Sequence, residues 1–163
     1  VRQTIGHYFQ LLKAKDYDGA KAMIAPQGLS TSPFLQGYQS LDTDYSKLGI
    51  YNYRLTKIMP KTEQDDKRYT AAVVEWTLMV ELTEEVATNE DQQAMGEKLA
   101  ALFPNGTVSY EETIQTFSVV AYRTVVAVAD QRQNNWQLIW DDETQGMTID
   151  KVPTEVRRAV GIE

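Results

Sequence analysis

The stretch from Tyr69 to Leu82, YTAAVVEWTLMVEL, decides the fold of this chain. Its even-numbered positions are mostly apolar, whereas its odd-numbered positions include Glu75, Thr77 and Glu81. Side chains alternate between the two faces of a strand, so this pattern predicts a strand with one buried face. At about 3.3 Å per residue the strand spans roughly 45 Å, so we expect it to twist and to need a cover over its apolar face.

Helical patterns precede this strand and can supply the cover. A first helix is predicted by apolar residues at i, i+3, i+4 and i+7, namely Ile5, Tyr8, Phe9 and Leu12. Asp16 can cap a second, short helix that ends before Pro26. A third helix is predicted from Ser32–Pro33 to Leu48, where Gly49 offers a left-handed stop, with a break at the polar segment 42–44.

Strand patterns dominate the rest of the chain. We expect strands at 50–59, 69–82, 110–130 and 136–140, the last with Trp136 and Trp140 aligned, and a helical insertion at about 84–106. Strand 110–130 carries apolar residues at both odd and even positions. This pattern indicates either that both faces of the strand are covered or that a bulge lies near 118–120. Residues 153–160 can form a short terminal helix or a linker. The order predicts an α+β fold in which early helices pack on a curved antiparallel sheet of about four strands around a cone-like hollow.

Composition narrows the class of protein. The chain has 163 residues, 42% hydrophobic and 24% charged, which suits one soluble globular domain. The net charge is −7 and no basic stripe is apparent, so nucleic acid is not an expected partner. The absence of cysteine excludes disulfides and thiolate chemistry within the chain, and no apolar run is long enough to cross a membrane. The first residue is Val rather than Met, so we expect a fragment or a processed product.

Known catalytic motifs are missing from the sequence. His7 is the only histidine, and it lies off the apolar face of the first helix, so we expect it to be exposed. The sequence contains no HExxH, EF-hand, phosphate-loop, GxGxxG or Ser-x-x-Lys pattern. We therefore expect no cofactor and no metal site.

Two features could still carry chemistry. Asp141 begins three successive carboxylates after the last strand, and a carboxylate with a raised pKa in an apolar hollow can abstract a proton. Such a run of carboxylates more often lies in solvent at the end of a strand. The tryptophans could line a ligand pocket, although such residues more often form core. The pocket-lining candidates are Tyr8, Trp76, Tyr122, Trp140 and Asp141.

The sequence also resembles a known family. YFQLLKAKDYDGAKAMI (Tyr8–Ile24) resembles the start of nuclear-transport-factor-2-like domains. YSKLGIYNYRLTKI (Tyr45–Ile58) and NWQLIWDDETQGM (Asn135–Met147) are similar to the N-terminal domain of methicillin-resistance-type penicillin-binding proteins. That family shows a Tyr-x-x-Leu-Gly-Ile/Val step and a Trp-x-Leu-x-Trp-Asp step followed by Gly-Met. Gln145 stands where its pattern has proline, and the insertion at 84–106 is larger.

The resemblance implies a function for the chain. It implies a nuclear-transport-factor-2-like domain over residues 1–149, with 150–163 as a tail or linker to a following domain. Such a domain is a non-catalytic stalk of a class B penicillin-binding transpeptidase, which cross-links peptidoglycan and reacts with β-lactams. Its expected partners are the downstream transpeptidase domain of the same polypeptide and cell-wall or divisome proteins. Its expected place is the extracytoplasmic face of a bacterial membrane, anchored through a segment outside this chain.

Two other functions stay open at this point. The first is a stand-alone exported protein of the same fold that binds a small ligand in the hollow. The second is an isomerase-like or dehydratase-like enzyme that uses a buried carboxylate such as Asp141.

Overall fold

A computed structural model describes residues 1–25, 33–83, 88–140 and 152–162. Helices α1 (Arg2–Lys13), α2 (Tyr17–Ala22) and α3 (Pro33–Leu41) come first, followed by strands β1 (Ser46–Ile58), β2 (Thr62–Gln64) and β3 (Lys67–Leu82). The later elements are α4 (Asn89–Leu102), β4 (Thr107–Glu111), the 3-10 turn η2 (Glu112–Ile114), β5 (Thr116–Asp130), β6 (Gln137–Trp140) and α5 (Thr154–Ala159). The predicted α+β class and the helix in the insertion are confirmed.

One antiparallel sheet contains all the strands of the described residues. Its order is β1-β3-β5-β4, with β2 paired to β3 and β6 paired to β5. This is a 6-stranded sheet, so the prediction of about four strands is wrong. One of the additional strands arises because the predicted strand 110–130 is in fact two strands. The chain reverses through η2 and Gln115, whose φ of 49° is left-handed, and β4 pairs back onto β5.

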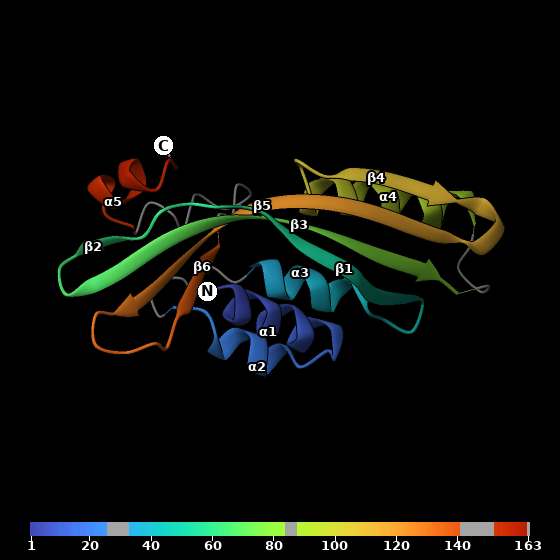
Figure 1. Ribbon diagram of the computed structural model, residues 1–163. Helices are drawn as coiled ribbons and strands as arrows, with labels where there is room; N and C mark the ends of the chain where they lie inside the picture. The colour runs from blue at the N-terminus through green and yellow to red at the C-terminus, as the bar shows by residue number, and fades with distance from the viewer. Residues whose placement is uncertain (26–32, 84–87, 141–151, 163) are drawn as a thin grey trace.

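Helices α1, α2 and α3 lie beneath the curved sheet, whereas α5 lies above its opposite face (Figure 1). The predicted burial of one face of β3 is confirmed, since the even-numbered residues from Thr70 to Leu82 are at most 4% exposed. Their apolar members share one core with the predicted face of α1, which consists of Ile5, Tyr8, Phe9 and Leu12. Side chains of α4, Leu99 above all, complete this core beside β4. His7 is exposed, as predicted.

Helix α5 covers the second face of the sheet near β2 and β6. Val152, Val156 and Val160 form an apolar cluster there with Tyr69, Ala71, Val126, Val128 and Ile139. Because α5 covers this second face, apolar residues occur at both odd and even positions of β5 beyond Thr124. The register of β3 with β5 runs without a shift from Lys67–Asp130 to Glu81–Thr116, so the alternative of a bulge near 118–120 is wrong.

The segment after α3 differs from the prediction. Helix α3 ends at Leu41 and β1 begins at Ser46, so Leu48 is a strand residue, and Gly49 lies inside β1 rather than at a helix stop. The Asp42 carboxylate accepts hydrogen bonds from Lys15 Nζ at 3.0 Å and from the Leu48 backbone N–H at 3.3 Å. Because Asp42 ties the turn to α1 and β1, it does not begin a second helical piece.

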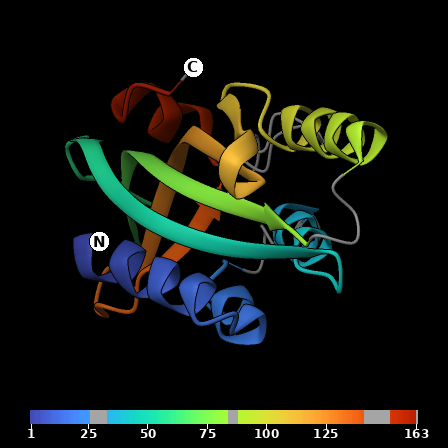
Figure 2. The ribbon, with the colours of Figure 1, turned by 90° about the vertical axis from the view of Figure 1, so that its right-hand side faces the viewer.

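Strand β1 forms one edge of the sheet. Two β-bulges, at Tyr51 and Thr56, interrupt its pairing with β3. Between them, Tyr53 stacks on Phe9 of α1, with ring centroids 4.8 Å apart and planes inclined by 7°. Helix α1 runs alongside β1 (Figure 2). A Cβ atom added to Gly6 would lie 2.8 Å from the Tyr53 hydroxyl, so a larger residue there would displace the end of that side chain.

Candidate functional site

Four aromatic rings meet between α1 and the sheet. Tyr8 and Phe9 come from α1, Trp76 comes from the middle of β3, and Trp140 ends β6. The centroid of the Trp140 ring lies 5.2 Å from that of Tyr8, 6.0 Å from that of Phe9 and 6.1 Å from that of Trp76. All four side chains are at most 6% exposed. Packed rings therefore fill the space between helix and sheet at this point.

Polar atoms are buried among these rings. The Tyr8 hydroxyl is completely buried and has no hydrogen-bond partner in the part of the chain that the structure describes. Burial raises the pKa of Tyr8 and of Tyr38 well above the ordinary tyrosine value, and the positive charge of Arg123 opposes this shift in both. Both phenols are therefore neutral at physiological pH, so neither is suited to act as a general base.

Arg123 is a partly buried cation beside this interior. It lies on β5 between buried Ala121 and Val125, on the strand face that the helices cover. Its Nη2 donates a hydrogen bond to the backbone oxygen of Leu102 at 3.2 Å. Leu102 is the last residue of α4, where carbonyl groups lack helical partners and cations are favourable. Arg123 thus attaches the end of α4 to the sheet.

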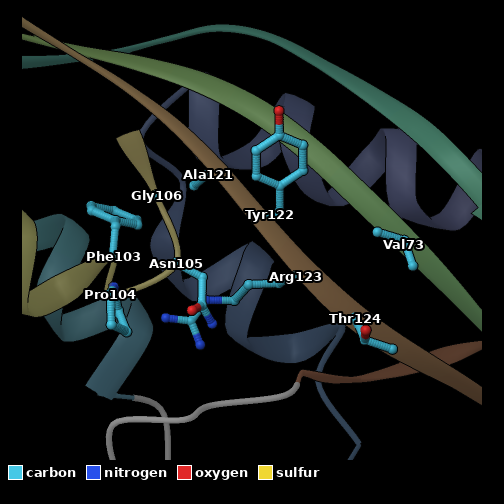
Figure 3. Close-up of a pocket in the computed structure, with 9 residues that line it drawn as sticks. All are labelled: Val73, Phe103, Pro104, Asn105, Gly106, Ala121, Tyr122, Arg123 and Thr124. Carbon is cyan, nitrogen blue, oxygen red and sulfur yellow. The ribbon is translucent and has the colours of Figure 1, made fainter. Parts of the chain in front are cut away.

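A cavity of about 170 Å³ opens beside Arg123. It lies along residues 121–124 of β5, between the stretch that pairs with β4 and the stretch that pairs with β6. Its lining consists of Val73, Phe103, Pro104, Asn105, Gly106, Ala121, Tyr122, Arg123 and Thr124. The side chains of Arg123 and Asn105 lie on one side of β5, whereas Tyr122 points to the other side (Figure 3).

The turn after α4 shapes this cavity. The Gly106 backbone N–H donates to the Phe103 oxygen at 2.8 Å, which closes the turn. A Cβ atom at Gly106 would lie 3.1 Å from the backbone oxygens of Phe103 and Val120, so the close approach of the turn to β5 favours glycine. Pockets for drug-sized ligands usually measure about 300–1,000 Å³, so this cavity suits only a small group or a few water molecules.

Tyr122 belongs to a polar ladder on the outer face of the sheet. Arg54 Nε lies 2.6 Å from Glu75 Oε1, and Tyr122 is also hydrogen-bonded to Glu75. The hydrogen bond from Arg54, followed by that from Tyr122, lowers the pKa of Glu75. The three residues are directly opposite one another on neighbouring strands β1, β3 and β5. The ladder is an open surface interaction rather than a site that excludes water.

The structure brings some of the predicted site residues together and separates others. Tyr8, Trp76 and Trp140 share the buried ring cluster, whereas Tyr122 lies on the other face of β5. Asp141 lies outside the described residues, as does the rest of the acidic run. The sequence reasoning missed Arg123, although it is the only charged residue between Glu112 and Asp130. A lone charge in such an apolar strand is the signal that could have identified it.

Comparisons with known proteins do not assign the chain to a family. No family model, curated protein or solved structure matches it. Within residues 1–25, 33–83, 88–140 and 152–162, no group of three or more histidine or acidic side chains could hold a metal ion. In the same ranges, no helix is both long enough and apolar enough to cross a bilayer.

Proposed function

We propose that this chain is a non-catalytic interaction module of a bacterial penicillin-binding transpeptidase. In this proposal it has a nuclear-transport-factor-2-like fold and stands outside the cytoplasmic membrane, between an anchor and a transpeptidase domain that belong to other parts of the polypeptide. The observation that carries the proposal is the sequence resemblance of Tyr45–Ile58 and Asn135–Met147 to such modules.

The places of these segments in the fold support the proposal. The first segment contains the whole of β1, and the described part of the second contains β6. The two segments lie 77 residues apart in sequence, yet both reach the same ring cluster. Tyr53 of β1 stacks on Phe9, and Trp140 of β6 contacts Phe9 edge-on. Residues that join the helices to the sheet are the ones expected to define a fold family.

The packing between α1 and the sheet supports a scaffold role over a catalytic one. Phe9, Trp76 and Trp140 occupy the interior with mutual ring contacts, and the buried phenols are held neutral by their surroundings. A module built in this way can hold neighbouring domains at a fixed separation without turnover.

Labelling with a fluorescent penicillin tests the proposal. The full-length gene product is expected to be acylated, and the isolated chain is expected to remain unlabelled. Trp140→Ala in the full-length protein should reduce the amount of folded protein without changing the acylation rate of each folded molecule. An open reading frame that ends soon after Glu163 without a penicillin-reactive domain would refute the proposal.

A small-ligand-binding protein is the second candidate, and the cavity beside Arg123 is the observation in its favour. Under this alternative, Arg123→Gln abolishes binding of a small carboxylate, measured by calorimetry. The enzyme alternative predicts a pH-dependent activity that Asp141→Asn removes.

A further inference from the structure

The positive charges of this acidic protein are concentrated in two segments. Residues 1–15 and 46–61 contain no Asp or Glu, and their cations are Arg2, Lys13, Lys15, Lys47, Arg54, Lys57 and Lys61. Since the whole chain has a net charge of −7, the remaining residues carry −14 (9 cations against 23 carboxylates). The two basic segments are distant in sequence, but they correspond mainly to α1 and β1.

The packing of α1 on β1 brings the two basic segments together. Positions 2, 6, 9 and 13 form one stripe of an α-helix, because successive residues are rotated by about 100°. Gly6 and Phe9, in the middle of the stripe, contact Tyr53 of β1. Arg2 and Lys13, at the ends of the stripe, are exposed. They therefore flank the line along which α1 meets β1.

Three further cations lie along the β1 edge of the sheet. Arg54 and Lys57 are exposed on β1 opposite Glu75 and Val73, so they project from the sheet face away from α1. Lys61 lies shortly beyond the end of β1, so cations flank this edge on both faces of the sheet. Lys61 is close enough to the start of α1 to contribute, after burial, to the lowered pKa of the Val1 amino group. We call Arg2, Lys13, Arg54, Lys57 and Lys61 the basic strip. Lys15 and Lys47 are left out, because Lys15 Nζ lies 2.8 Å from Asp42 Oδ2 and Lys47 lies directly opposite Glu81 on β3.

Exposed aromatic and apolar side chains accompany the basic strip. Tyr51 protrudes at the first bulge and is 69% exposed, and Ile58 at the end of β1 is 42% exposed. Lysine and arginine next to tyrosine is the combination that proteins place at the headgroup level of membranes.

The structure argues against other partners for this surface. Bulges and lysines on an edge strand disfavour the addition of another strand, so an extended peptide is a poor fit. A long polyanion such as nucleic acid would also pass over the acidic remainder of the molecule, which repels it. A bilayer surface touches one side of the protein only, and charge interactions fade beyond about 8 Å at physiological salt.

We propose that the basic strip binds the surface of an anionic lipid bilayer, with Tyr51 and Ile58 at headgroup level. Each lysine or arginine near such a surface strengthens binding about fivefold. Arg54 contributes less, because Glu75 neutralises it at 2.6 Å. This inference uses only the charges and the packing of α1 on β1, so it holds independently of the proposed function.

Co-sedimentation of the whole chain with vesicles tests the inference. We expect binding to phosphatidylcholine vesicles that contain phosphatidylglycerol, no binding to pure phosphatidylcholine, and release at high salt. Lys13→Gln with Lys57→Gln should weaken binding by about 25-fold, since two cations are lost. The matched control, Lys98→Gln with Arg132→Gln, changes the net charge equally on α4 and in the β5–β6 turn and should bind like the wild type.

Several results would overturn the inference. They are no binding to the anionic vesicles, equal binding to neutral vesicles, and equal losses in the two double variants. Binding to polyglutamate or to single-stranded nucleic acid without binding to vesicles would assign the strip to a different partner. Far-UV circular dichroism of each variant, matching that of the wild type, ensures that a loss reflects the surface and not unfolding.

Discussion

Replacing Trp140 by alanine tests the packing between α1 and the sheet. The Trp140 ring is 6% exposed and contacts Tyr8, Phe9 and Trp76. Truncation of a buried tryptophan removes these contacts and leaves a cavity, which costs about 3–5 kcal/mol. Domains are usually stable by about 5–15 kcal/mol, so the variant should lose a large part of its free energy of unfolding.

Trp136→Ala is the matched control, because it removes the same side chain four positions earlier. Trp136 precedes β6 and is only partly buried, with Lys61 Nζ 5.9 Å and Arg68 Cζ 5.3 Å from its ring. Each cation–π contact at such a site contributes about 0.5–1 kcal/mol, so we expect a loss of about 1–2 kcal/mol.

Urea unfolding followed by far-UV circular dichroism measures both losses. With an m value of about 2 kcal/mol/M, the midpoint should fall by about 2 M for Trp140→Ala and by less than about 1 M for Trp136→Ala. A loss below about 1 kcal/mol for Trp140→Ala, or a larger loss for Trp136→Ala, would show that the ring cluster is not the core of the fold.

Three further predictions follow from single contacts. Tyr8→Phe removes a buried hydroxyl that has no partner in the described ranges, so thermal denaturation should show unchanged or slightly higher stability; a loss above about 1 kcal/mol would reveal a bonded hydroxyl. Gly106→Ala should cost about 1–3 kcal/mol, because its Cβ would press on the Val120 oxygen at 3.1 Å, and a stabilised variant would contradict this geometry. The pKa of Asp42 is lowered, chiefly by its hydrogen bond from Lys15, so its contribution is present above the unfolded pKa and disappears as pH falls through the folded value. Asp42→Asn should therefore be less stable than the wild type at neutral pH and equal to it in acid, whereas a constant difference across the titration would contradict the ion pair.

The sequence predicts those parts of the fold whose pattern is local and strong. Alternation along β3 and helical spacing along α1 correctly identify the two faces that form the core. The reversal between β4 and β5 is missed, because residues 111–116 contain neither glycine nor proline and strand-forming residues continue on both sides. A left-handed Gln115 carries no sequence signal of its own.

The candidate site is harder to predict than the fold. The alternation of side chains along β3 places Trp76 on the buried face. It cannot show which face Tyr122 occupies, because the chain between the two residues contains a turn that the sequence does not reveal. The basic strip is invisible in the sequence for a related reason. Lys13 and Lys57 lie 44 residues apart, and only the packing of Tyr53 on Phe9 brings their two segments together.

The pairing of β3 with β5 also has a consequence for folding kinetics. Its innermost pair, Glu81 and Thr116, encloses a loop of about 35 residues, and its outermost pair, Lys67 and Asp130, encloses about 63. Closing the smaller loop is favoured by only about 0.5 kcal/mol of chain entropy, yet every later pair then forms without a new closure. We therefore expect the pairing of β3 with β5 to begin at the end beside α4 and to extend from there along both strands. Folding should take milliseconds to seconds, as in other chains dominated by contacts between residues distant in sequence.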